Sequence, residues 1–275
     1  MKKILVFTDL DGTLMDAETY SYAEAIIAIK ALIDRNIPVI PCTSKTHLEV
    51  IKTRKSLGIS DPFIVENGSA VFFKPDYFSE VKQTGQMLDG YQYLLLGSDY
   101  TDILPFFDDW RNRYQINATG FHEMTVEQVI KLTDLSSEEA ELAHKRFFSE
   151  PFILNDDKQL PIAAIEDIVK NGFRLLLGNR FYHLLGNSDK GTAVRKLSDL
   201  FRKDRGINDL ITIGIGDSMN DLEMLKAVDM PVLVKKTNGN HQQGIKMDNL
   251  MLTDGIGPAG WQEAILKILK ISGKD

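Results

Sequence analysis

The sequence lacks the features that mark secreted, membrane-spanning or nucleic-acid-binding proteins. It has a single cysteine, Cys42, among 275 residues, so no disulfide can form within the chain. No stretch approaches the roughly 20 consecutive apolar residues that a membrane-spanning helix needs. Lysine and arginine, at 32, are outnumbered by 39 acidic residues, and the net charge of −7 argues against a general nucleic-acid binder.

These absences also predict where the protein works. A lone cysteine at the end of the apolar run 39–42 is typical of a packed side chain, and it fits a reducing compartment. The apolar run at the amino terminus stops at Thr8-Asp9, which is too short for a signal-peptide core. We therefore expect a cytoplasmic protein, monomeric or homodimeric, with no membrane or nucleic-acid partner.

What the sequence does contain is an ordinary globular composition and, at first, alternating strand and helix patterns. Residues 4–7 form a continuous apolar run, as expected for a strand buried on both faces of a parallel sheet. Apolar residues at helical spacing follow over 22–33. Further strands are predicted at 37–42 and 63–65, with a capping box at 46–49 that opens a second helix. This order predicts a parallel sheet with right-handed crossovers.

The last part of the chain resumes this alternation. Helix, strand, helix, strand, strand and helix patterns follow one another over residues 189–202, 210–215, 219–228, 231–234, 249–252 and 261–271. Joined to the first part, they complete one sheet with helices on both faces. We therefore predict an α/β fold with a doubly wound, Rossmann-like parallel-sheet core.

Residues 84–186 have a different texture. Capping boxes at 125–128 and 136–139 are mixed with several strand-like apolar runs. Such a mixture predicts a separate α+β unit. We predict a catalytic core domain made of 1–83 and 187–275, with residues 84–186 inserted as a cap domain that determines substrate specificity.

The first polar motif, Asp9-Leu10-Asp11-Gly12-Thr13, directly follows the first predicted strand. If the strand geometry persists, the carboxyl groups of Asp9 and Asp11 point to the same side. Close carboxylates repel each other unless a cation or a shared proton intervenes. An ordinary turn explains this motif equally well when it is taken alone, because Asp and Gly favour turns.

The second motif, Thr43-Ser44-Lys45-Thr46, follows the second predicted strand. A hydroxyl and an ammonium group before a helix amino terminus suit the binding of an anion. An ordinary helix cap is the simpler explanation when this motif stands alone, since Ser and Thr are common capping residues. The motif therefore indicates an anion site only in combination with others.

The third motif, Ser188-Asp189-Lys190-Gly191-Thr192, places a cation in the first turn of a predicted helix. That end of the helix dipole is unfavourable for a positive charge, at a cost of roughly 0.3–1 kcal/mol. A charge placed against the local field indicates another use for Lys190. A solvated surface lysine is the alternative, and it weakens if this turn is buried.

The fourth motif, residues 214–221, reads Gly-Ile-Gly-Asp-Ser-Met-Asn-Asp and lies between a predicted strand and a short helix. Its glycines allow close approach of the backbone, and Asp217 and Asp221 supply the hard oxygen ligands that magnesium prefers. A capped helix accounts for one of these acids but leaves the cluster unexplained. We therefore favour a metal site here.

All four motifs lie at the ends of predicted strands, where a doubly wound sheet places its binding site. Together they supply a carboxylate nucleophile, a second carboxyl group, a hydroxyl, a lysine and a metal site. Phosphoryl transfer through an aspartyl-phosphate needs this set of groups. The combination therefore predicts a phosphoryl-transfer enzyme.

These residues resemble the four motifs of the haloacid dehalogenase superfamily of phosphatases, over both core segments. The resemblance implies that Asp9 is the nucleophile and that Asp11 is the general acid and base. It implies that Thr43 and Lys190 bind phosphoryl oxygens. It also implies a Mg²⁺ cofactor held by Asp9, Asp11, Asp217 and Asp221, with Asn220 orienting that shell.

The second motif and the cap narrow the subfamily. Many capped relatives have Thr-Gly-Arg where this chain has Thr43-Ser44-Lys45. With residues 148–152 and 180–184, the chain most resembles members that hydrolyse 2-O-mannosyl-3-phosphoglycerate to mannosylglycerate, a compatible solute. The implied substrate is a small anionic phosphorylated sugar-acid. The residues expected to bind it are Ser44, Lys45, Asn67, Gly68, Glu150, Arg180 and His183. Lys45 and Arg180 suit its carboxylate, and Glu150 suits sugar hydroxyls.

The sugar and the fate of the phosphoryl group stay open at this point. The cap aromatics are equally explained by packing, and a structural histidine accounts for His183 as well as a ligand does. The alternatives are a phosphatase for glucosyl-3-phosphoglycerate or sucrose phosphate, a phosphomutase on the same core, and a non-catalytic module that binds a phosphorylated metabolite. The intact core motifs favour an enzyme over that module.

Overall fold

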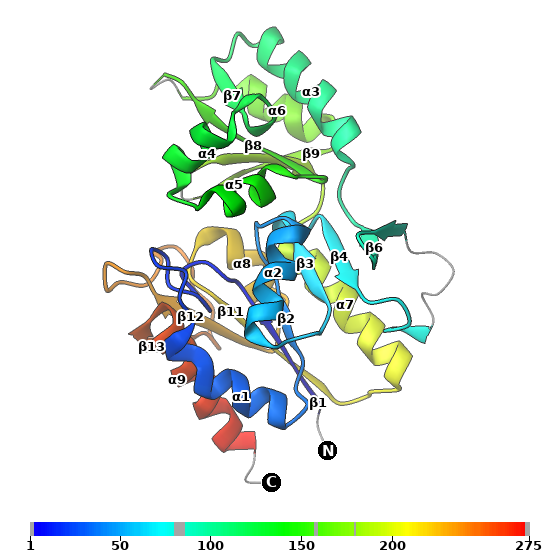
Figure 1. Cartoon of the computed structure of the whole chain (residues 1–275), viewed down its shortest axis with the longest axis vertical. Helices are drawn as coiled ribbons and strands as arrows, with labels where there is room; N and C mark the ends of the chain where they lie inside the picture. The colour runs from blue at the N-terminus through cyan, green and yellow to red at the C-terminus, as the bar shows by residue number, and fades with distance from the viewer. Residues whose placement is uncertain (1–2, 80–85, 157–158, 179, 273–275) are drawn as a thin grey trace.

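A five-stranded parallel sheet forms the centre of the computed structural model (Figure 1), which describes residues 3–79, 86–156, 159–178 and 180–272. Its strands are β1 (Lys3–Thr8), β2 (Val39–Pro41), β11 (Leu210–Gly216), β12 (Met230–Lys235) and β13 (Met251–Ile256). The strand order is β13-β12-β11-β1-β2. Strand β1 therefore lies between β2, the next strand along the chain, and β11, which comes after the predicted cap. The predicted α/β fold with a doubly wound sheet is confirmed.

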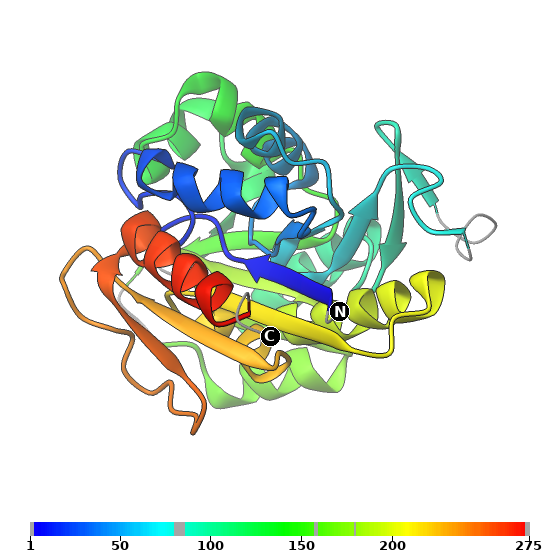
Figure 2. The ribbon, with the colours of Figure 1, turned by 90° about the horizontal axis from the view of Figure 1, so that it is seen from below.

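Helices cover both faces of this sheet because its strands are apolar on both sides. One face packs against α1 (Ile26–Asp34), α2 (His47–Leu57) and α9 (Gly257–Ser272). The other face packs against α7 (Lys190–Arg205) and α8 (Leu222–Lys226). Seen from below, α1 and α9 lie side by side over the sheet (Figure 2).

A smaller antiparallel sheet lies beside the β2 edge. Its strands, in the order β3-β4-β6-β5, are β3 (Phe63–Val65), β4 (Ala70–Phe73), β6 (Tyr91–Leu95) and β5 (Gln86–Leu88). It is joined to the parallel sheet by a bridge between Ile64 and Cys42, which is buried. In this sheet β6 pairs with β4 and β5 pairs with β6, although the predicted boundary at residue 84 assigns both strands to the cap.

The predicted cap region has its own four-stranded antiparallel sheet, in the order β7-β8-β10-β9. These strands are β7 (Ala118–Gly120), β8 (Ser149–Leu154), β10 (Tyr182–Gly186) and β9 (Phe173–Leu177). On one face pack α3 (Tyr100–Arg113) and α6 (Ile162–Lys170); α4 (Val126–Thr133) and α5 (Ser137–His144) lie on the face toward the parallel sheet (Figure 1). We keep the division into core and inserted cap as a proposal.

Local sequence signals account for the helix starts near the site. Thr46 accepts a hydrogen bond from the Glu49 backbone N–H, and the Glu49 carboxylate accepts one from the Thr46 N–H, so the predicted capping box opens α2. The boxes at 125–128 and 136–139 open α4 and α5 in the same way. Single 3-10 turns connect other elements: η1 (Ala23–Ala25), η2 (Glu66–Gly68), η4 (Phe121–Glu123) and η5 (Met219–Asp221).

Within the described ranges, no helix is long and apolar enough to cross a bilayer.

Candidate active site

The carboxyl ends of β1 and β11 meet at the point where the strand order reverses. Asp9 follows β1 and Asp217 follows β11, and the two strands are paired in parallel up to Thr8 and Ile215. The Asp9 backbone N–H donates to the Ile215 carbonyl at 2.9 Å, which continues the pairing for one more residue. Polar groups from two distant parts of the sequence therefore converge at the switch point of the sheet.

Lys190 brings a positive charge into this convergence. Its Nζ lies 2.7 Å from Asp9 Oδ1 and 2.6 Å from Asp221 Oδ1, and the side chain is 1% exposed. Burial lowers the pKa of Lys190, but the carboxylates of Asp221 and Asp9 outweigh that effect and raise it. The lysine at the unfavourable end of α7 is thus stabilised by two buried acids, and the solvated-lysine alternative is excluded.

Asp221 organises the loop that carries Asp217. Its Oδ2 accepts hydrogen bonds from the backbone N–H groups of Asp217 and Ser218, both at 3.1 Å. A Cβ atom at Gly216 would lie 2.5 Å from the Asp221 Cβ, so only glycine fits there. Because Lys190 takes the other oxygen, Asp221 is fixed from both sides.

Oxygen atoms of Asp9, Asp217 and Asp221 form a cluster that fits a metal ion. One oxygen of each lies within 4.8 Å of the others, and all three residues are buried. Burial and the neighbouring Asp221 raise the pKa of Asp217 to about 6. Burial also raises the pKa of Asp9 well above its ordinary value, against the attraction of Lys190. Three hard donors with a surplus of negative charge are what a divalent cation compensates.

The carboxylate of Asp11 points away from this cluster. Its Oδ2 lies 3.0 Å from Lys45 Nζ, which also reaches Glu49 Oε1 at 3.4 Å and lies over the Tyr20 ring at 5.1 Å from its centroid. Burial lowers the pKa of Lys45, but Asp11 and Glu49 outweigh it and raise the pKa. The Asp11 side chain is therefore oriented by Lys45 and stands apart from the three clustered acids.

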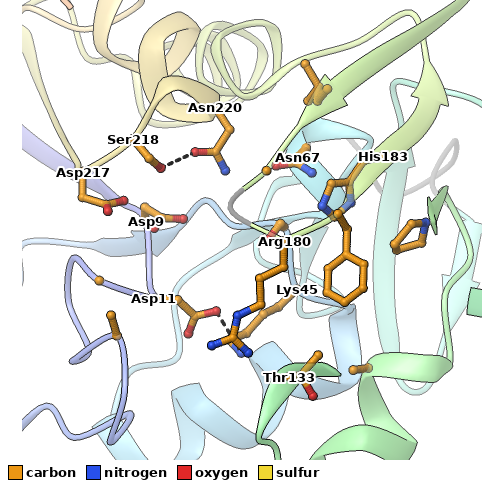
Figure 3. Close-up of a pocket in the computed structure, with 18 of the residues that line it drawn as sticks. Asp9, Asp11, Lys45, Asn67, Thr133, Arg180, His183, Asp217, Ser218 and Asn220 are labelled. Carbon is orange, nitrogen blue, oxygen red and sulfur yellow. Dashed lines mark hydrogen bonds and ion pairs between the residues drawn. The ribbon is translucent and has the colours of Figure 1, made fainter. Parts of the chain in front are cut away.

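A cavity of about 720 Å³ opens above Asp9 and Asp11, between the parallel sheet and the predicted cap (Figure 3). Its core wall carries Ser44, Lys45 and Asn67. Its cap wall includes Arg146, Phe121, Phe181, Arg180 and His183. Figure 3 places the Arg180 guanidinium beside Asp11 and Lys45, and His183 beside Asn67. The structure thus brings most of the predicted residues into one space.

Some polar atoms on these walls are buried without a partner among the described residues. They are Asn67 Oδ1, His183 Nδ1 and Asp11 Oδ1. Burial lowers the pKa of His183 to about 3, and the charges of Arg146 and Lys190 act in the same direction. His183 is therefore neutral at pH 7. Unpaired buried polar atoms are costly, so their presence in the cavity indicates a ligand with hydroxyl groups.

Besides Lys190, which contacts Asp9 from below the cavity lining, three other predicted substrate or phosphoryl ligands do not line the cavity. Glu150 is fully buried within the cap, where it accepts hydrogen bonds from Tyr100 and from the His122 ring at 2.8 Å; this corrects its assignment to sugar hydroxyls. Gly68 (φ +95°) packs against Asp189, where an added Cβ would lie 2.2 Å from backbone atoms. Thr43 is buried and accepts a bond from the Lys45 N–H at 3.2 Å, so its contact with phosphoryl oxygens stays a prediction.

Sequence reasoning missed several residues that shape the site. Arg146 is buried and donates to the Ser44 carbonyl at 2.8 Å, although 102 residues separate the two. The sequence pattern predicts only a capping role for Glu49, yet this carboxylate also contacts Lys45. Neither role has a local signal, because the partners come together only in the folded chain.

Asp9, its partner Lys190 and the adjoining acids are residues that a family of related enzymes can share. The sequence pattern of the haloacid dehalogenase-like hydrolases matches residues 6–159 and 179–247. The chain therefore belongs to the haloacid dehalogenase-like hydrolase family, and the predicted resemblance is confirmed. Asp9, Lys190 and Asp217 all lie within the matched residues.

Two curated proteins are similar to this chain over nearly its whole length. Proteins from Persephonella marina and Methanococcoides burtonii, both named glucosyl-3-phosphoglycerate/mannosyl-3-phosphoglycerate phosphatase, are 41% and 39% identical, over 97% of this chain and 97% of their own. This chain is a phosphoric monoester hydrolase.

Solved structures share its fold. The crystal structure of Thermoplasma acidophilum 0175 has a TM-score of 0.68 at 19% identity, over 98% of this chain and 99% of that one. A haloacid dehalogenase-like hydrolase from Bacteroides thetaiotaomicron has a TM-score of 0.64 at 17% identity, over 97% of this chain and 100% of the other.

Proposed function

We propose that this chain is a magnesium-dependent phosphatase for 2-O-mannosyl-3-phosphoglycerate, releasing mannosylglycerate and phosphate through an aspartyl-phosphate on Asp9. The glucosyl ester is its second substrate, because the two named relatives carry both sugars in their names. The observation that carries the proposal is the buried Asp9–Lys190 pair at the floor of a cavity that also holds the cations of Lys45 and Arg180. That charge pattern suits a phosphoryl group at one end of a substrate and a carboxylate at the other.

Asp9 is the proposed nucleophile because one of its oxygens is held by a cation, while the other accepts only a long hydrogen bond from Thr13 that attack on phosphorus can displace. Lys190 binds Oδ1 at 2.7 Å, whereas the Thr13 hydroxyl lies 3.4 Å from Oδ2. Attack of that oxygen on phosphorus forms the aspartyl-phosphate and expels the glycerate oxygen. Lys190 then faces the phosphoryl oxygens and stabilises their charge, as does Thr43 if its hydroxyl turns toward the site.

Asp11 is the proposed general acid and base. It stands at the mouth of the cavity beside Asp9, with its Oδ1 buried and unpaired within the described part of the chain. In the first half-reaction it would give a proton to the leaving oxygen, and in the second it would take one from the attacking water. Lys45 keeps the carboxyl group turned into the cavity during both steps.

Magnesium is the proposed cofactor, and the acids fit it. Asp9 and Asp217 would hold the ion, together with the Asp11 backbone carbonyl, while Asp221 and Asn220 orient the loop around Asp217. Asp221 is the weaker ligand candidate because both of its oxygens already accept hydrogen bonds. When bound, magnesium supplies positive charge that screens Asp9 from the phosphate dianion.

The walls of the cavity offer both charged and neutral contacts to the rest of the substrate. Lys45 and Arg180 would bind the glycerate carboxylate, since both reach the space above Asp11. Ser44, Asn67 and neutral His183 would bind sugar hydroxyls, which can satisfy the unpaired atoms of the last two. A cytoplasmic location stays a prediction.

A substrate panel tests the proposal. Phosphate release is measured with magnesium for mannosyl- and glucosyl-3-phosphoglycerate, 3-phosphoglycerate, mannose 6-phosphate and sucrose 6-phosphate. We expect the two glycosyl esters to have the highest kcat/KM, by about 100-fold over the hexose phosphates, because only they satisfy both walls. A preference for a simple hexose phosphate would contradict the proposed substrate but not the assignment as a phosphoric monoester hydrolase. An isomerised sugar phosphate without free phosphate would identify a mutase.

A further inference from the structure

A buried carboxylate that catalysis does not use lies between the core and cap walls. Glu66 is fully buried at the start of η2, next to the cavity residue Asn67. Both residues have left-handed backbone conformations, with φ of 47° and 59°. Residues other than glycine rarely adopt this conformation unless the surrounding structure enforces it. A strained segment, Glu66-Asn67, therefore lies at the cavity wall.

The Glu66 carboxylate accepts hydrogen bonds from a cap segment that we name the docking loop, residues 146–149. Glu66 Oε1 accepts the Phe147 N–H at 3.1 Å. Glu66 Oε2 accepts the Phe148 N–H at 3.2 Å and the Ser149 hydroxyl at 2.7 Å. Arg146 Nε lies 3.5 Å from the same oxygen. A single core carboxylate therefore holds the whole docking loop.

The docking loop also reaches the second polar motif. Arg146 donates to the Ser44 carbonyl at 2.8 Å and to the Ser149 hydroxyl at 2.9 Å. The Phe147 ring meets the His47 ring edge-on, with centroids 5.3 Å apart. Glu66, Phe148 and Ser149 are buried, whereas Phe147 is 37% exposed. Buried polar contacts are strong when complete and costly when broken, so the bonds to Glu66 favour keeping the two walls joined.

Backbone hydrogen bonds carry this position on to the cavity. The Glu66 N–H donates to the Lys45 carbonyl at 3.0 Å, and the Asn67 N–H donates to the Thr43 carbonyl at 2.9 Å. On the cap side, the docking loop runs into β8, whose Pro151 lines the cavity and pairs with His183 of β10. Glu66 is therefore linked to the core wall through backbone hydrogen bonds and to the cap wall through the docking loop and β8.

We propose that Glu66 is a positioning residue for hydrolysis: by holding the docking loop, its carboxylate sets Lys45 and Asn67 against the cap wall that carries His183. The role is mechanical and independent of which sugar is bound. Only its kinetic readout rests on the proposed function. When the cap wall moves away, Glu66 loses its hydrogen-bond donors together, so the carboxylate favours the closed cavity.

The first test is hydrogen exchange of the whole protein without substrate. Glu66→Gln keeps the shape of the side chain but removes one acceptor and the charge facing Arg146. We expect the Phe147 and Phe148 amides, and with them residues 44–46, to exchange at least about 10-fold faster. Faster exchange in the docking loop with no change in 44–46 would overturn the coupling between the two walls.

Glu123→Gln is the matched control. Glu123 also accepts a backbone N–H, that of Gly120 at 2.9 Å, and also pairs with an arginine, Arg111, but all three lie within the cap. Exchange of residues 44–46 should therefore stay as in the unmodified protein. Ser149→Ala, which removes one of the bonds to Glu66, serves if Glu66→Gln does not fold, and a smaller change in the same direction is expected.

The second test separates positioning from general stability. For Glu66→Gln we expect KM for mannosyl-3-phosphoglycerate to rise about 10-fold, while kcat/KM for 4-nitrophenyl phosphate changes less than about 2-fold. The small ester does not span both walls, and its good leaving group needs little help from the acid that Lys45 orients. Equal losses on both esters would overturn the proposal. If the glycosyl ester is not a substrate at all, the proposed function fails, and the exchange experiment still decides the role of Glu66.

Discussion

The floor and the walls of the cavity differ in how well their polar groups are satisfied. On the floor, the carboxylates of Asp9 and Asp221 share the ammonium of Lys190, and all three are buried. On the walls, Asn67 and His183 keep buried atoms without a partner among the described residues. A floor whose buried charges already face one another is preorganised for a step common to all phosphate esters. The unpaired walls indicate where a particular substrate completes the site.

The sharpest way to break this comparison is to remove the proposed nucleophile, Asp9, from the floor. Asp9→Asn should lower kcat by about 10⁴-fold or more, because no covalent intermediate can form. Folding should be retained, since the change removes a negative charge from a cluster of acids. Steady-state phosphate release and circular dichroism measure the two properties. Asp199→Asn, at an exposed surface position, is the control; activity above about 1% in Asp9→Asn would exclude the nucleophile.

The second prediction concerns the metal that the floor would bind. Chelation should abolish turnover, and magnesium at about 100 times its Kd should stabilise the protein by about 2.7 kcal/mol, visible as a rise in Tm. Asp217→Asn should lose most of that rise because a ligand of the proposed site is gone. Calcium and magnesium titrations of both proteins by thermal unfolding make the measurement. An equal rise in the variant would place the ion elsewhere.

The third prediction uses the low pKa of His183 on the cap wall. Unfolding returns this pKa from about 3 to its ordinary value near 6.5, so the unfolded chain binds the extra proton. Stability is therefore complete above about pH 6.5 and is lost as the pH falls toward 3. At pH 5 the loss from this residue is about 2 kcal/mol. Urea unfolding of His183→Asn and of the unmodified protein at pH 7 and pH 5 should show that difference, and parallel pH curves would contradict it.

The smallest expected effect is at the outer part of the wall. The Arg180 side chain is 47% exposed and donates to the Leu132 carbonyl at 3.2 Å. Arg180→Met should raise KM for the glycosyl ester about 10-fold and leave kcat nearly unchanged, because the contact is equal in ground and transition states. Arg195→Met, an exposed arginine on α7, is the control. A fall in kcat without a change in KM would move Arg180 to the chemical step.

The same division decides what could be predicted from the sequence. The structure brings Asp9, Lys190 and Asp217 together because each follows a strand or opens a helix, and parallel strands end at one edge of a sheet, which the sequence pattern predicts. The sequence predicts a strand at 152–154, just after Glu150, but neither its start at Ser149 nor the side that Glu150 faces. Neighbouring residues on a strand face opposite sides, so Pro151 faces the cavity and Glu150 faces Tyr100. Which face is inside depends on how the cap sheet packs.

Contacts over long sequence separations escaped prediction for a related reason. Arg146 meets Ser44 across 102 residues, and residues 86–95 join the β4 edge instead of the cap sheet. Local patterns predict a strand or a helix, but they carry no information on which distant edge or carbonyl it meets.

The single thiol offers a different view of the molecule. Cys42 lies at the end of β2, where its N–H donates to the Thr8 carbonyl at 2.8 Å, and burial raises the pKa of its thiol. The thiolate attacks an alkylating reagent whereas the buried thiol does not, so this sulfur reacts only when β2 separates from β1. Because the chain has no other cysteine, the rate of alkylation measures how often the central sheet opens beside β1, the strand that Asp9 follows.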